Sequence, residues 1–180
     1  MFSRRVARDL KPVIPCLGSY SGVFVVAKTA TLVQLVLFIV DEQTYALPLA
    51  AAERVLRIVE ITPLPGAPDS VEGVINIQGD VVIVVSVRRR LGLAERSAGA
   101  ADSLIVARAR ARRVAIIAES VVGVVERPVD AVVSAGHITP GIEPIEGVLK
   151  TSEGLVLIHD LDRFFSATEE QFLDQALERL

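Results

Sequence analysis

The sequence predicts an all-β fold of two similar β-barrels, followed by one helix at the C-terminal end. Three observations support this prediction. Of the 180 residues, 42 are Val or Ile, and β-branched aliphatic residues favour strands. Short apolar runs alternate with turn residues along most of the chain. One segment also recurs at an offset of 74 residues, which indicates two copies of one structural unit.

Composition excludes several classes of protein. The 22 acidic and 19 basic residues give a net charge of −3, too weak a field to draw the whole molecule to a polyanion. A single Cys excludes a disulfide framework and favours a cytoplasmic location. Two His and one Cys cannot build a structural zinc site. The apolar run 23–40 is interrupted by Lys28 and Gln34, so we interpret it as strand and expect no membrane insertion.

The elements are expected in the following order. Strand-type runs cover LVQLVLFIV (32–40), YALPL (45–49), the extended segment that follows it, two strands within 71–93, three within 104–126 and two within 146–165. Turns are expected at 41–44, at Gln78-Gly79-Asp80 and near 152–154. Residues 127–144 are interpreted as mostly loop.

The two ends of the chain differ in character. Residues 1–31 combine arginines with four Pro and Gly breaks and carry the only cysteine, Cys16. We expect a flexible leader here, or a start site assigned too far upstream. At the other end, Ser166 and Glu169 have the spacing of a capping box, and Phe172, Leu173 and later apolar residues fall on one helical stripe. This predicts a helix that packs on the domain formed by residues 32–180.

The internal repeat sets the architecture. Glu72-Gly73-Val74 and the hairpin after it resemble Glu146-Gly147-Val148 and its hairpin. Residues 47–56 resemble 115–124 more weakly. Two copies of an all-β unit predict two small pseudo-symmetric barrels that meet along a shared seam, and barrels also remove exposed strand edges.

Candidate reactive groups are few. His159 and Asp160 are neighbours on a predicted strand, so their side chains point to opposite faces and cannot form a relay. The segment 73–79 lacks the pattern of a phosphate-binding loop. We therefore expect no catalytic residue, no cofactor and no metal.

Arginines cluster in one predicted hairpin. Arg108, Arg110 and Arg112 would share one face of a strand, with alanines on the other. A basic SH3-like barrel that binds nucleic acid is the alternative function, but no aromatic residue is interleaved with these arginines to stack on bases. A solvated hairpin tip is favoured, and we expect no nucleic-acid partner.

Residues 61–93 resemble the CheW family of chemotaxis adaptors. The resemblance rests on a proline-rich turn, then EGVINIQG, then an apolar strand that ends in SVR, where the family has D-L-R. It extends over residues 32–180 and implies two intertwined five-stranded SH3-like barrels with a C-terminal helix. The chain departs from the family pattern at Gln78, Ile83 and Ser86, where the family has Arg, Pro and Asp.

The resemblance also implies a function. CheW-like adaptors are non-catalytic scaffolds in bacterial two-component signal transduction. They couple the cytoplasmic tip of methyl-accepting chemoreceptors to the regulatory domain of a CheA-type histidine kinase, in arrays at the membrane. The positions that match the family's receptor groove are Ala52, Arg54, Val55, Gly73, Gln78 and Gly79.

Overall fold

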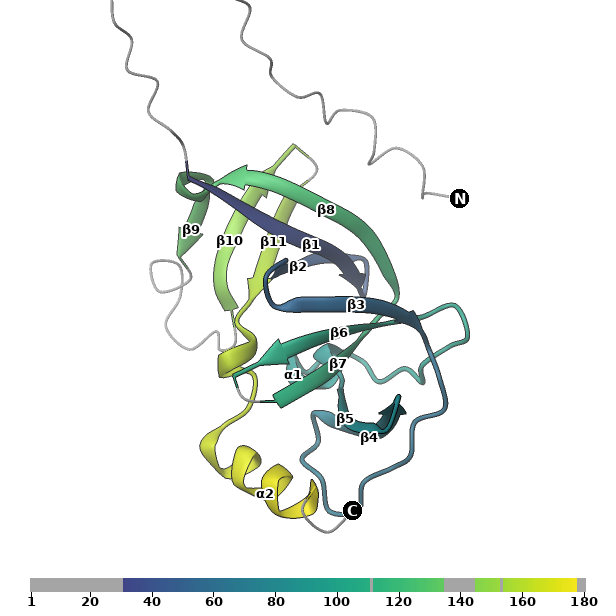
Figure 1. Cartoon of the computed structure of the whole chain (residues 1–180). Helices are drawn as coiled ribbons and strands as arrows, with labels where there is room; N and C mark the ends of the chain where they lie inside the picture. Colours follow the sequence, from purple (N-terminus) through teal and green to yellow (C-terminus); the bar gives the residue numbers. More distant parts are fainter. Residues whose placement is uncertain (1–30, 111, 135–144, 153, 178–180) are drawn as a thin grey trace, which may run out of the picture. The chain divides into compact units, whose positions relative to one another are not determined.

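Two β-sheets make up most of the described part of the chain (Figure 1). The computed structural model describes residues 31–110, 112–134, 145–152 and 154–177. Apart from residue 31, the expected leader with Cys16 lies outside these residues. The all-β prediction is confirmed.

The first sheet has six strands. In spatial order they are β8 (Ser120–Pro128), β1 (Leu32–Val40), β2 (Gln43–Pro48), β11 (Gly154–His159), β10 (Ile145–Thr151) and β9 (Val132–Ser134). The short strand β9 lies in a segment that the sequence indicated as loop, so that expectation is wrong for these three residues. Three residues give only a weak alternation pattern, and the pairing with β10 that makes them a strand is not local.

The second sheet has five strands. In spatial order they are β3 (Ala52–Arg57), β6 (Ser103–Ala109), β7 (Arg112–Ala118), β5 (Asp80–Val85) and β4 (Val71–Ile77). A short helix, α1 (Val87–Arg90), follows β5 where the sequence suggested more strand. Ser86 caps it by accepting a hydrogen bond from the Arg89 backbone, which ends the strand at Val85.

Each sheet takes one strand from the other half of the repeat. β3 follows β2 in the chain but pairs with β6 of the other sheet, and β8 follows β7 but pairs with β1. The weak repeat between residues 47–56 and 115–124 thus marks the two segments that cross between sheets. Because the exchange is reciprocal, the sheets are intertwined, as the family resemblance implied.

The edge strands of each sheet are consecutive in the chain. β8 and β9 are separated only by the 3₁₀ turn η1 (Val129–Ala131), so the two ends of the six-stranded sheet must come together. In the five-stranded sheet, the chain leaving β3 reaches β4, where Thr62 forms an isolated bridge with Val74. Both sheets therefore curl towards closed barrels.

Three apolar clusters fill the fold. One lies inside each sheet, and the largest joins residues of both sheets. Successive residues of β5 alternate between them: Val82 and Val84 belong to the cluster inside the five-stranded sheet, whereas Ile83 and Val85 belong to the shared one. Strands buried on both faces explain why the sequence is so rich in valine.

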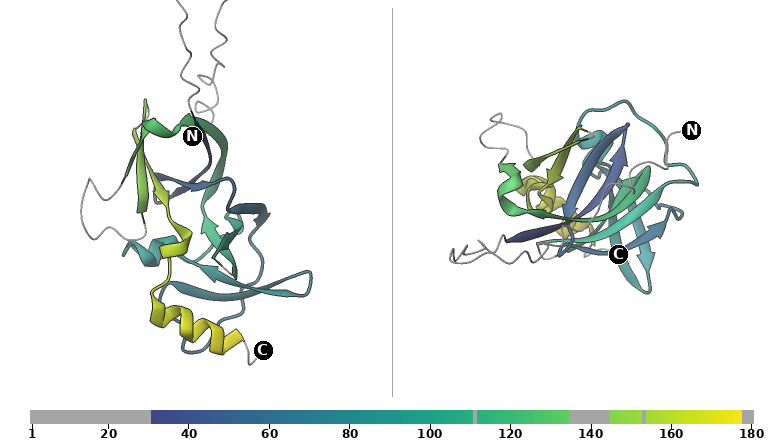
Figure 2. Two further views of the ribbon diagram at one scale, coloured as in Figure 1. Left: turned by 60° about the vertical axis from the view of Figure 1, so that its left-hand side comes forward. Right: turned by 90° about the horizontal axis from the view of Figure 1, so that it is seen from above.

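The predicted C-terminal helix is present as α2 (Ala167–Leu177). Its capping box is formed: the Ser166 backbone N–H donates to Glu169 Oε2 at 2.7 Å, and the Glu169 N–H donates to Ser166 Oγ at 3.3 Å. Leu173 is fully buried in the shared cluster and Phe172 packs against that cluster. In Figure 1 and the left view of Figure 2, α2 lies far from β9 and β10.

Candidate partner-binding site

The residues singled out by the sequence lie on the two edge strands of the five-stranded sheet and in one turn. Three lie on β3, one on β4 and two between β4 and β5: Ala52, Arg54, Val55, Gly73, Gln78 and Gly79. The edges approach each other because the chain after β3 bridges to β4. The structure thus places these residues on one barrel.

Gly73 is buried and contacts its own chain. It has a φ of +150°, and a Cβ atom there would overlap the carbonyl oxygen of Thr62 and lie 2.9 Å from Cγ2 of Ile61. Glycine is needed because any side chain would push away the segment that closes the barrel. Its role in the structure is therefore internal packing.

Gln78 and Gly79 form the exposed tip of the β4–β5 hairpin. Both have positive φ, +57° and +97°, as a two-residue turn between twisted strands requires. The Gly79 N–H donates to Oδ1 of Asn76 at 2.8 Å, which fixes the turn. The hairpin predicted at Gln78-Gly79-Asp80 is thus confirmed.

An ion network connects this turn to β3. Arg113 of β7 donates to Glu53 on β3 and to Asp80 after the turn, both at 2.8 Å. Arg108 of β6 adds a 3.1 Å contact to Glu53. One guanidinium group therefore spans from β3 to the β4–β5 turn, and the network fixes their separation.

The predicted arginine face is wrong in its geometry. β6 ends at Ala109 and β7 begins at Arg112, while Arg110 lies in the turn with φ +48°. Arg110 contacts Glu170 at 3.3 Å and Arg112 contacts Asp174 at 2.7 Å, both on α2. Each of these arginines, like Arg108, has a carboxylate partner within the chain, so part of the positive charge of this stretch is balanced internally.

His159 and Asp160 have separate surroundings. His159 ends β11 with 1% exposure, and its ring centroid lies 5.2 Å from that of Tyr45 and 6.4 Å from that of Phe38. Asp160 accepts a hydrogen bond from the Asp162 backbone at 2.9 Å and caps the 3₁₀ turn η3 (Leu161–Arg163). The histidine thus lies among buried rings while the aspartate caps a turn.

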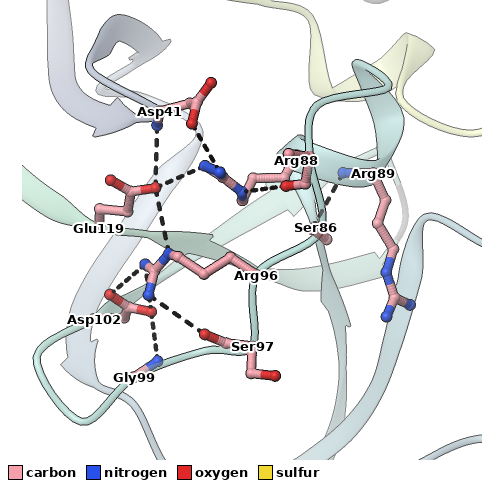
Figure 3. Close-up of polar contacts among 10 residues, drawn as sticks. Asp41, Ser86, Arg88, Arg89, Arg96, Ser97, Gly99, Asp102 and Glu119 are labelled. Atoms are coloured by element: carbon pink, nitrogen blue, oxygen red, sulfur yellow. Dashed lines mark hydrogen bonds and ion pairs between the residues drawn. The ribbon is translucent and has the colours of Figure 1, made fainter.

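A second polar network, missed in the sequence, joins the two sheets (Figure 3). Arg88 of α1 has a side chain only 14% exposed and contacts Asp41 in the β1–β2 turn at 2.8 Å and Glu119 at 2.9 Å. Glu119 is the single residue between β7 and β8, where the chain crosses between sheets. Arg88 therefore links the β1–β2 turn to the point where the chain crosses from β7 to β8.

The same network extends into the loop after α1. Arg96 contacts Glu119 at 3.6 Å and makes two hydrogen bonds, of 2.8 and 2.9 Å, to the buried Asp102. These hydrogen bonds, which Arg96 donates to Asp102, raise the pKa of Arg96 above its usual value, although partial burial opposes the rise. Only one segment of this network was singled out from the sequence, the SVR of residues 86–88, which stands where the CheW-like family has D-L-R. No partner for Arg88 could be predicted from it.

Two hollows flank the short turns that end the repeated hairpins. One, of about 530 Å³, is lined by Glu72, Ser86 and Arg88 among others. The other, of about 320 Å³, is lined by Glu146, Asp160 and Asp162 among others. Each of these three residues of the first hollow is 74 residues before one of the three from the second, which is the offset of the repeat. The two hollows therefore lie at equivalent places of the two copies but have different charges.

The described residues show neither a metal-binding group nor a membrane-spanning helix. Within the described ranges, no group of three or more His, Cys, Asp or Glu side chains is arranged to hold a metal ion. No helix in that part of the chain is long and apolar enough to cross a membrane.

Comparison with known proteins identifies the family. The model of the CheW-like domain matches residues 34–169, most of the chain. The chain belongs to the CheW-like family. A chemotaxis protein CheW of Thermotoga maritima is 30% identical over 127 residues, covering 70% of this chain and 83% of that protein. One from Treponema pallidum is 24% identical over 146 residues, covering 78% and 86%.

A solved CheW has the same fold. The crystal structure of the scaffolding protein TtCheW from Thermoanaerobacter tengcongensis superimposes with a TM-score of 0.71 at 23% identity. The match covers 77% of this chain and 96% of TtCheW. The CheW-like resemblance and the fold predicted from the sequence are confirmed.

Proposed function

We propose that this CheW-like chain is a non-catalytic adaptor that couples methyl-accepting chemoreceptors to the regulatory domain of a CheA-type histidine kinase. The family match over residues 34–169, together with the two intertwined sheets, carries the proposal. An adaptor needs docking faces rather than a reactive centre, and the partly open edges of two barrels provide such faces. The chain would act in the cytoplasm, recruited to receptor arrays.

The receptor-facing surface in this proposal is the edge formed by β3 and the β4–β5 turn. Arg54, Val55 and Gln78 are exposed there, and the Glu53–Arg113–Asp80 network fixes their spacing. Gly73 supports the surface from within by allowing the barrel to close. A receptor hairpin would lie against this edge, and many weak links of this kind would add up in an array.

The test is reconstitution with purified components. The full chain would be mixed with the kinase regulatory domain and with the cytoplasmic hairpin of a receptor, both encoded in the same genome, and complexes separated by size-exclusion chromatography. A ternary complex that forms without any small-molecule cofactor is expected. Failure of both partners to bind the folded chain would refute the adaptor function.

A further inference from the structure

Most arginines of the chain are neutralised by its own carboxylates. The described residues contain twelve arginines, and nine of them form an ion pair: Arg88, Arg89, Arg90, Arg96, Arg108, Arg110, Arg112, Arg113 and Arg163. Of the twelve arginines that the structure describes, only Arg54, Arg57 and Arg127 form no ion pair. Two of these three lie on β3, whereas Arg127 and the unpaired Lys150 lie on separate strands of the other sheet, so among the described strands β3 is the one that carries two unpaired cations.

The nearest carboxylate on β3 is already engaged. Glu53 accepts from both Arg108 and Arg113 at 3.1 and 2.8 Å, so it has little capacity left for Arg54. Glu60, exposed after the end of the strand, is the only other acid of this segment. The edge therefore keeps an excess of positive charge that the chain itself does not balance.

Apolar side chains lie between these charges. Val55 is 46% exposed and Val59 is 48% exposed. The Ile58 N–H donates to the Asp102 carbonyl at 3.1 Å, so the extended ladder with β6 continues past Arg57. Val55, Arg57 and Val59 are thus at alternate positions of an extended segment and share one side of it, while Arg54 faces the other side. Exposed valines beside unpaired arginines are typical of a surface that binds a partner.

We infer that the partner segment bound along β3 is acidic, with carboxylates placed on either side of apolar residues. This inference rests on the proposed function and specifies the chemistry of the receptor tip that the adaptor accepts. Guanidinium groups bind carboxylates through paired hydrogen bonds, and the valines supply the apolar contact.

The directions of the side chains on β3 constrain the partner further. Arg57 shares its side of the strand with Val55 and Val59, whereas Arg54 points to the opposite side. A receptor helix along this edge should therefore carry one carboxylate beside its apolar residues for Arg57, and a second on the flank that reaches over the edge towards Arg54.

Affinity for the receptor hairpin, measured by titration calorimetry at low and at high NaCl, tests the inference. Arg54→Glu with Arg57→Glu should weaken binding about 30-fold or more, and Arg54→Gln with Arg57→Gln should weaken it less, about 5- to 10-fold. Wild-type binding should weaken as salt is raised. Changing the two receptor acids to Lys should restore binding to the Glu variant.

The matched control is Arg127→Glu. Arg127 is also without an ion pair but lies on β8 of the other sheet, so receptor affinity should not change. Circular dichroism confirms that each variant is folded. Wild-type affinity in the double Glu variant would overturn the inference and leave the adaptor function intact. The inference is also overturned if the double Glu variant keeps its affinity for the receptor but loses binding to the kinase domain, to a second copy of the chain or to an oligonucleotide. If the wild-type chain binds neither receptor nor kinase, the proposed function itself fails.

Discussion

The two copies of the repeat, residues 71–90 and 145–164, have nearly the same backbone but opposite charges where each meets the other sheet. Both hairpins have a register shift at the same point, before Gly73 and before Gly147. Both second strands pair in parallel with the second strand of another hairpin, β5 with β7 and β11 with β2. Backbone geometry has been retained in both copies.

The charges differ at the next step. Two residues after the capping residue, Ser86 or Asp160, the first copy has Arg88 and the second has Asp162 at the equivalent position. Asp162 accepts a 2.6 Å hydrogen bond from the Arg110 backbone in the β6–β7 turn. In the first copy the equivalent turn N–H, that of Asp41, donates at 3.1 Å to Glu119, and Arg88 binds both acids. The backbone N–H of each tight turn therefore has a carboxylate acceptor. In the second copy the acceptor is Asp162 itself, whereas in the first copy it is Glu119, which is bound by Arg88.

The two copies also touch each other. Arg90 and Phe164 are equivalent positions of the repeat, and the guanidinium carbon of Arg90 lies 5.7 Å from the Phe164 ring centroid. Beyond this point the copies diverge, since a coil that contains Arg96 follows the first and α2 follows the second. The repeat thus fixes how the sheets pack, while the differing side chains decide what each surface binds.

The largest expected difference between the copies concerns their glycines. Gly73→Ala should lower the free energy of unfolding by about 3–5 kcal/mol, since it combines an unfavourable φ with overlap of the Thr62 backbone. Gly147→Ala should lower it by about 1–2 kcal/mol, because its φ is ordinary and its nearest neighbour, at 2.8 Å, is a Val132 methyl. Urea unfolding followed by circular dichroism measures both values.

Gly123→Ala separates strain from overlap. Gly123 has a φ of +145°, close to that of Gly73, but a Cβ there would have no atom within 4 Å. It should cost about 1–2 kcal/mol from strain alone. If Gly73→Ala is no more destabilising than Gly123→Ala, close contact with Thr62 is not what makes glycine necessary.

The second comparison is between Arg88 and Asp162. Arg88→Met should lower the free energy of unfolding by about 2–4 kcal/mol, because it leaves Asp41 without its cation and Glu119 with only the 3.6 Å contact to Arg96. Asp162→Asn keeps an acceptor oxygen for the Arg110 N–H and should cost about 1 kcal/mol or less. Thermal and urea unfolding give both values.

A double-mutant cycle checks the cause. Adding Glu119→Gln to Arg88→Met removes one of the two neighbouring carboxylate charges, those of Asp41 and Glu119. The double variant should therefore be more stable than the sum of the two single changes predicts. Additive losses would show that Arg88 stabilises the fold through packing of its aliphatic stem rather than through its two carboxylates.

The sequence predicted the parts of the fold that local pattern determines. Alternating valines, the Gln78-Gly79 turn and the Ser166–Glu169 capping box all involve residues within a few positions of each other, and each was correct. Local pattern did not predict the exchange of β3 and β8, which only the family resemblance implied, because a strand-type run does not specify which sheet it joins. Strand β9 was missed for the same reason, since its three residues are a strand only through β10.

The candidate site was predicted in part. The sequence singled out the residues of β3 and the β4–β5 turn, and the structure places them on one barrel edge. It gave no indication that Gly73 would be buried, because its neighbour Thr62 lies directly before the proline-rich turn and nothing in the local pattern shows that it bridges to β4. The Arg88 network was missed because Asp41, Arg88 and Glu119 are far apart in the sequence and charged residues are common on any surface.

The smallest expected effect concerns α2, which only the second copy possesses. Glu169 of α2 contacts Arg90 of the first copy at 3.2 Å. Burial tends to raise the pKa of Glu169, but hydrogen bonds from Ser166 and Ser70 and the charge of Arg90 outweigh it, so the pKa lies below its usual value. The ionised side chain therefore stabilises the fold above the unfolded-state pKa of about 4.3, and this stability is lost as the pH falls through the lower folded-state pKa.

Glu169→Gln should accordingly lower the free energy of unfolding by about 1 kcal/mol at pH 7, and the difference from wild type should shrink as the pH is lowered below about 4. Glu170→Gln is the matched control on the same helix, because its partner Arg110 is largely exposed, and its cost at pH 7 should be smaller. Urea unfolding at a series of pH values measures these differences. A loss for Glu169→Gln that stays constant down to pH 3 would show that ionisation of Glu169 is not what stabilises the contact between α2 and the first copy.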